Sequence, residues 1–109
     1  MRSRDLPGVL ITGLVLLAFA GCESAPSNAP PVTAALIRTG TRENADARML
    51  SRGRSLLLHR CIQCHAPPDA AKLSPERLRN VLATMASRAH LSPEEHEAVL
   101  KYLLAVRSL

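Results

Sequence analysis

The residues with the clearest chemical potential are two cysteines and a histidine in the middle of the chain. Cys61 and Cys64 are separated by two residues, and His65 follows the second cysteine directly. This spacing is the attachment pattern of a c-type haem. Each thiol can add across one vinyl group to form a thioether, and His65 can ligate the iron from the same turn. The pattern predicts one covalent haem c, with His65 as the proximal iron ligand.

Two other kinds of site also use closely spaced cysteines. A thioredoxin-like dithiol is expected beside a βαβ unit, and no run of this sequence has the alternating, β-branched pattern of a strand. A structural zinc site needs four ligands from Cys and His, and the usual second pair at fixed spacing is absent. A fourth zinc ligand would have to be His59, His90 or His96. Both alternatives stay open, and haem is favoured over them.

The N-terminus predicts export, which agrees with the attachment of c-type haem outside the cytoplasm. Arg2 and Arg4 precede an apolar run from Val9 to Ala20, and a second small residue, Gly21, follows. This is the pattern of a secretory signal peptide, which we expect over residues 1–21. The apolar run is too short to span a bilayer comfortably.

The stretch from Leu17 to Cys22 resembles the lipobox of bacterial lipoproteins, with Phe19 where that motif usually has Leu. In such proteins the Cys becomes the lipidated first residue of the mature chain. The alternative is cleavage near Ala20 that leaves Cys22 as a free thiol, but an odd third Cys in an exported protein needs an explanation. We therefore expect lipidation of Cys22 and anchoring on the periplasmic side of a bacterial membrane.

After processing, the chain is expected to consist of a tether and one small domain. Glu23–Thr33 contains Pro26, Pro30 and Pro31 among small polar residues, a composition typical of a linker that forms no packed element. Residues 34–44 are unassigned or partly helical. We therefore expect a lipid-anchored, flexible tether over residues 22–44 and a haem domain over residues 45–109.

The domain is expected to be helical. Asn44 or Asp46 can start a first helix, which Pro67 and Pro68 end because they remove backbone donors and force extended geometry. Two later helices start at Ser74-Pro75-Glu76 and Ser92-Pro93-Glu94-Glu95. Each start has a hydroxyl cap, a proline at the first helical position and acid in the first turn. Ser92 and Glu95 also match a capping box.

Each of the last two helices has one apolar face. The faces consist of Leu78, Val81, Leu82 and Met85 in one helix and of Val99, Leu100, Leu103 and Leu104 in the other. A domain this small, in a chain with 2% aromatic residues, rarely has a sufficient core of its own. A covalently held haem would give three amphipathic helices a large apolar body to close around.

With these elements, residues 45–109 resemble a small monohaem cytochrome c of the class I kind. The resemblance depends on Gly53 and Leu57, the Cys61–His65 motif, Met85, the start of the last helix, and Tyr102-Leu103-Leu104. It implies an all-α, cytochrome c-like three-helix domain wrapped around one haem, with His and Met iron ligands and a role in carrying single electrons. It also implies that Gly53 lets Tyr102 pack closely.

Met85 is the preferred candidate for the distal iron ligand, because a thioether ligand raises the potential as suits an electron carrier. The alternative is that Met85 fills the core. An open distal site would then favour a protein that binds or senses a diatomic gas. A bis-His haem is a further alternative, with His96 and His90 as weaker candidates and His59 expected to point outward.

The charge balance restricts the partners. The chain carries a net charge of +5, which can steer docking onto an acidic redox partner or simply belong to a solvated surface. Some of four arginines in the first helix can pair with haem propionates: Arg48, Arg52, Arg54 and Arg60. Nucleic-acid binding is disfavoured because the chain is exported and lacks a reading motif. We expect no enzyme activity, and a monomer or a subunit of a redox complex with a redox protein as partner.

Overall fold

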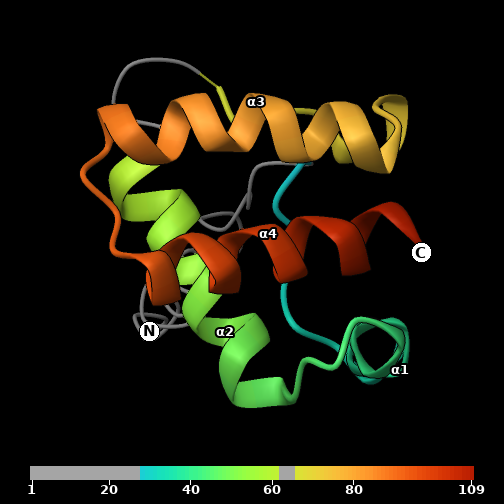
Figure 1. The fold of residues 1–109 in the computed structure, drawn as a ribbon. Helices are drawn as coiled ribbons and strands as arrows, with labels where there is room; N and C mark the ends of the chain where they lie inside the picture. The colour runs from blue at the N-terminus through green and yellow to red at the C-terminus, as the bar shows by residue number, and fades with distance from the viewer. Residues whose placement is uncertain (1–27, 62–65) are drawn as a thin grey trace, which may run out of the picture.

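The computed structural model describes residues 28–61 and 66–109, and within these ranges every regular element is helical (Figure 1). In chain order the elements are α1 (Ala34–Arg42), α2 (Ala47–Leu56), the π-helical turn η2 (Leu57–Cys61), the 3₁₀ turn η3 (Ala70–Lys72), α3 (Pro75–Arg88) and α4 (Pro93–Arg107). The all-α class is confirmed for this part of the chain. The expected signal peptide and three expected site residues, Cys22, Cys64 and His65, lie outside the described residues.

The predicted helix starts are confirmed. Asp46, rather than Asn44, caps α2, because its Oδ1 accepts a hydrogen bond from the backbone N–H of Met49 at 2.8 Å. Ser74 caps α3 by accepting the N–H of Arg77 at 3.1 Å. Side-chain acceptors at these positions satisfy backbone donors that have no partner inside the helix.

α4 begins with the predicted capping box. The N–H of Glu95 donates to Ser92 Oγ at 3.1 Å, and the N–H of Ser92 donates to Glu95 Oε1 at 2.9 Å. The turn from α3 to α4 passes through His90, whose φ of 55° lies in the left-handed region that few residues other than glycine adopt. In Figure 1 the two helices run antiparallel on either side of this turn.

α1 is a helix that the sequence left unassigned, so the described domain has four α-helices where three were expected. Thr33 caps it by accepting the N–H of Leu36 at 3.3 Å. Leu36 is fully buried, and Thr39 Oγ1 donates to the Ala105 carbonyl of α4 at 2.9 Å. α1 is therefore part of the folded domain.

Residues 28–33, which we call the strap, also differ from the expected flexible tether. Ala29 is 0% exposed. The hydroxyl of Tyr102 donates to the Pro30 carbonyl at 2.6 Å, and Arg54 Nε donates to the Ala29 and Pro30 carbonyls at 3.2 and 3.0 Å. Proline removes backbone donors but leaves the carbonyls as acceptors, and donors from α2 and α4 use them here. The strap is thus held on the domain by side chains distant in sequence.

α2 and α4 cross at Gly53, where the backbones of the two helices approach closely. A Cβ atom at Gly53 would collide with the Ala98 carbonyl oxygen and lie 2.8 Å from Tyr102 Cβ. Both obstacles belong to α4, and the carbonyl belongs to its backbone. The close packing of Gly53 and Tyr102 expected from the resemblance is therefore confirmed.

The core lies where the four helices meet. The largest fully buried side chains are Leu36, Leu50, Leu57, Leu78, Leu82, Val99, Tyr102 and Leu103. On the two apolar faces predicted for α3 and α4, the buried residues are Leu78, Leu82, Val99, Leu103 and Leu104. Val81, Met85 and Leu100 are only partly buried. The core therefore leaves part of the apolar surface of both helices uncovered.

Candidate haem-attachment site

Cys61 is the one residue of the attachment motif within the described residues, and it closes η2 with 6% of its surface exposed. Burial raises the pKa of its thiol, and the positive charge of Arg60 offsets only part of this effect. A thiol in such a place carries little thiolate, which is the reactive form in redox exchange and in metal binding.

η2 turns the chain between the end of α2 and Cys61. Leu57 is fully buried, whereas His59 and Arg60 are exposed, so the outward direction expected for His59 is confirmed. His59 Nδ1 lies 2.7 Å from the Ser55 carbonyl oxygen, which makes Nδ1 the protonated nitrogen of this contact. π-helical turns are rare, occur mostly as single turns, and are frequent at functional sites.

Arg60 attaches the end of η2 to the turn between α3 and α4. Its Nη2 lies 3.8 Å from Glu95 Oε2, and its Nη1 donates to the Ala89 carbonyl at 3.5 Å. The pKa of the Glu95 carboxyl is lowered, first by the backbone N–H of Ser92 and then by the charges of Arg60 and Arg52, although desolvation opposes this. Arg60, the residue before Cys61, therefore links the end of η2 to this turn.

Met85 and Leu91 flank the same turn. The Ala89 N–H donates to the Met85 carbonyl at 2.9 Å, and the Leu91 N–H donates to the Ala86 carbonyl at 3.0 Å. Met85, Leu91 and four further side chains are partly buried against the core cluster that includes Cys61: Leu56, Leu58, Leu73 and Leu100. These side chains keep part of their apolar surface exposed, which is the kind of surface that a covalently attached haem would cover.

The candidates for the distal iron ligand lie in different parts of the structure. Met85 lies in the second half of α3, partly buried against the core, and its role as distal ligand stays a prediction because His65 is not described. His90 is exposed in the turn, and His96 is partly buried in the first half of α4. Within residues 28–61 and 66–109, no group of three or more His, Cys, Asp and Glu side chains is arranged to hold a metal ion.

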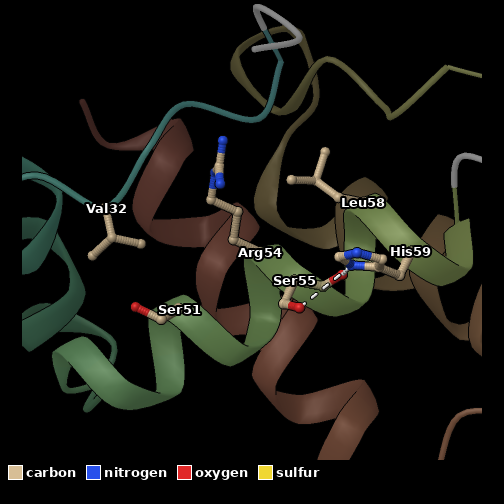
Figure 2. Close-up of a pocket in the computed structure, with 6 residues that line it drawn as sticks. All are labelled: Val32, Ser51, Arg54, Ser55, Leu58 and His59. Carbon is tan, nitrogen blue, oxygen red and sulfur yellow. Dashed lines mark hydrogen bonds between the residues drawn. The ribbon is translucent and has the colours of Figure 1, made fainter. Parts of the chain in front are cut away.

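A small cavity of about 220 Å³ lies between the strap and the α2–η2 segment. Figure 2 shows its lining, to which the strap contributes Val32 and η2 contributes Leu58 and His59. Its volume is below the range of about 300–1,000 Å³ typical of ligand pockets. Arg54, which also lines it, donates to strap carbonyls. The cavity is therefore a gap beside the strap rather than a place for a cofactor.

The contacts of Arg54 and Arg60 were not foreseen in the sequence, which indicated both only as possible partners of propionates. Arg54 holds the strap, and Arg60 reaches Glu95. No local pattern indicates either partner, because Pro30 and Glu95 lie 24 and 35 residues away from these arginines. Glu95 was recognised only as part of a capping box.

No family model, no curated protein and no solved structure matches this chain. Among the described residues, no helix is long and apolar enough to cross a membrane. The function is therefore argued from the attachment motif and from the residues around Cys61.

Proposed function

We propose that this chain is a monohaem cytochrome c that carries single electrons while tethered by a lipid to a membrane of the bacterial cell envelope. The observation that carries the proposal is the Cys61-Ile62-Gln63-Cys64-His65 motif, with Cys61 at the end of the helical segment that crosses α4 at Gly53. Residues 1–22 support export and lipidation by their sequence pattern. The chain itself carries out no substrate chemistry.

Each site residue has one task in this proposal. Cys61 and Cys64 form the two thioethers, His65 is the proximal iron ligand and Met85 is the distal one. A haem bound in this way supplies the one-electron change of its iron. The protein provides attachment, ligation and the exclusion of water by partly buried apolar side chains such as Leu91 and Leu100.

Arg52 and Arg60 are the candidate partners of the haem propionates. Both act electrostatically on Glu95, so both side chains lie near the turn that flanks Met85. Guanidinium groups form strong, paired hydrogen bonds with carboxylates. Arg54 and Arg60 already have protein partners, the strap carbonyls and the Glu95 carboxylate, so a propionate would compete with these contacts.

A second function is favoured by one observation, the packing of Met85 against the core cluster. A methionine held in the core as filler leaves the distal side of the iron open. The protein would then bind or sense a diatomic gas. This function uses the same attachment by Cys61, Cys64 and His65 and differs only in the sixth ligand.

The visible spectrum of the full chain, exported together with haem-maturation machinery, tests both functions. We expect low-spin bands, oxidised and reduced, that carbon monoxide does not change. A high-spin spectrum that shifts with carbon monoxide would support the gas-binding function instead. A purified chain without haem absorbance would overturn both, and a Cys22→Ser variant serves as control because it leaves the haem motif intact.

A further inference from the structure

We propose that the strap holds the domain on the membrane with the side that carries Asn28 and Pro67 toward the lipid surface. The proposal rests on the lipid anchor at Cys22, which is part of the proposed function. It goes beyond that function because it assigns a membrane-facing surface, and it identifies the membrane itself as the occupant of that surface.

The point where the described chain begins lies beside Pro67. Asn28 Nδ2 donates to the Pro67 carbonyl at 3.3 Å, and Pro67 is only two residues beyond His65. The next residue, Ala29, is fully buried. The described chain therefore begins at a defined place on the domain, in contact with Pro67.

Hydrogen bonds from two helices hold the strap in this place. Pro30 receives hydrogen bonds from both Tyr102 and Arg54 through its carbonyl oxygen. These donors come from α4 and α2, the two helices that cross at Gly53. The strap is therefore hydrogen-bonded to both helices of the α2–α4 pair.

The remaining length of chain is short compared with the domain. Cys22 lies six residues before Asn28, and six residues span about 20 Å at full extension. A domain of some 80 residues is roughly 30 Å across. A lipid at Cys22 therefore keeps the Asn28 side of the domain close to the membrane, and the tether is too short for the opposite side to take its place.

The two sides can be followed in Figure 1. The strap starts near α3, passes α4 and ends at α1. η3 begins three residues beyond Pro67, and Lys72 within it and Arg107 near it are exposed. Arg107 Nε donates to the Leu73 carbonyl at 2.7 Å, so its charge is fixed beside η3. Lys72 is paired with Asp69, with its Nζ 3.7 Å from Asp69 Oδ2.

Two exposed positions provide a matched pair for the test. Ala71 belongs to η3 on the side of Pro67, and Thr41 lies near the end of α1. Ala71→Cys and Thr41→Cys variants of the full, haem-loaded, lipidated chain each have one free thiol, because the three native cysteines are modified. Each thiol is labelled with a fluorescent donor. The protein is then bound to vesicles of phosphatidylcholine and phosphatidylglycerol with an energy acceptor on a lipid headgroup.

The readout is the loss of donor lifetime to acceptor lipid, expressed as the difference between the reciprocal donor lifetimes with and without that lipid, because quenching by haem is present in both samples and cancels. We expect a larger loss at Ala71 than at Thr41. An insert of about 20 Gly and Ser residues between Ser27 and Asn28, with a span of roughly 25 Å, should reduce this difference. An equal loss at the two positions, a larger loss at Thr41, or a difference that the insert does not reduce would overturn the proposal.

Two measurements made first separate this proposal from the proposed function. Haem content, from the absorbance of the haem–pyridine complex, tests the function, and a chain without haem overturns that function alone. Mass spectrometry of the mature N-terminus tests the lipid, and an unmodified Cys22 overturns the membrane-facing surface while leaving the haem function standing.

Discussion

The hydroxyl of Tyr102 donates a 2.6 Å hydrogen bond to the carbonyl oxygen of Pro30, 72 residues earlier in the chain. Tyr102 also packs against Gly53 at the crossing of α2 and α4. One side chain thus joins the strap to the two helices that carry the domain. The arrangement links the N-terminal end of the domain to the helix that leads to Cys61.

Removal of this hydrogen bond should weaken the domain slightly. We expect Tyr102→Phe to lower the free energy of unfolding by about 1 kcal/mol, the usual net value of one hydrogen bond, because Arg54 still donates to the Pro30 carbonyl. Urea unfolding of the haem-loaded chain measures this change in the free energy of unfolding. Thr41→Ala, at an exposed position, is the control. A Tyr102→Phe variant as stable as the parent would contradict the role given to the bond.

The same residue predicts a dependence on alkaline pH. Burial raises the pKa of Tyr102 to about 12, whereas an unfolded tyrosine titrates near 10. The stability that depends on neutral Tyr102 is therefore complete below pH 10 and is lost as the pH rises toward 12. The loss over this range should be smaller in Tyr102→Phe than in the parent. Equal losses would mean that Tyr102 ionises as readily in the folded chain.

Gly53→Ala should destabilise the domain although alanine favours helices. The added Cβ collides with the Ala98 carbonyl, which cannot move without displacing α4. Overpacking costs about 1–3 kcal/mol against a helix-propensity gain of up to about 1 kcal/mol. We expect a net loss of about 1–2 kcal/mol in thermal or urea unfolding.

The control for Gly53 is Ser51→Ala, an exposed change on the same helix, which should be neutral or slightly stabilising. A Gly53→Ala variant as stable as Ser51→Ala would show that the two helices can separate without cost.

Glu95 should contribute to stability in a pH-dependent way. Its carboxylate accepts the Ser92 N–H at 2.9 Å and lies near Arg60, and both lower its pKa from 4.5. Its contribution is therefore present above pH 4.5 and is lost as the pH falls through the lower folded value. Glu95→Gln should be less stable than the parent at neutral pH, and the difference should shrink in acid. If the stability difference between Glu95→Gln and the parent did not depend on pH, it would come from the hydrogen bond alone and not from the charge of the carboxylate.

The helix starts were predictable from the sequence because each depends on neighbours three residues apart. Ser74, Ser92 and Asp46 each accept a hydrogen bond from the backbone N–H three residues later. The apolar faces of α3 and α4 were predictable from the helical spacing of their apolar residues. The strap and α1 could not be predicted in this way. The strap is ordered by Tyr102 and Arg54, whose contacts with it exist only after folding.

The candidate site was predicted from spacing alone, and its surroundings were not. Cys61, Cys64 and His65 form a recognisable local pattern. The contact of Arg60 with Glu95 joins two helices, and the burial of Cys61 depends on the whole core. Met85 was identified by its position on the apolar face of α3, and whether it binds iron depends on residues outside the described ranges.

Met85 is tested by comparison with Met49, which is also partly buried against the core. We expect Met85→Ala to lower the reduction potential and to let carbon monoxide bind the iron, because a thioether ligand stabilises the ferrous state. Met49→Ala should change neither property, although both variants lose a partly buried side chain. If neither variant changes the potential or the carbon monoxide response, Met85 is not the distal ligand.

Covalent attachment of haem is the central claim, and denaturing electrophoresis with haem staining, combined with intact mass, tests it most directly. The parent chain, exported together with haem-maturation machinery, should keep one haem after denaturation. The Cys61→Ser, Cys64→Ser double variant should keep none, and Cys22→Ser should keep it as the parent does. A parent chain that migrates without haem and has the mass of the bare polypeptide would contradict the account.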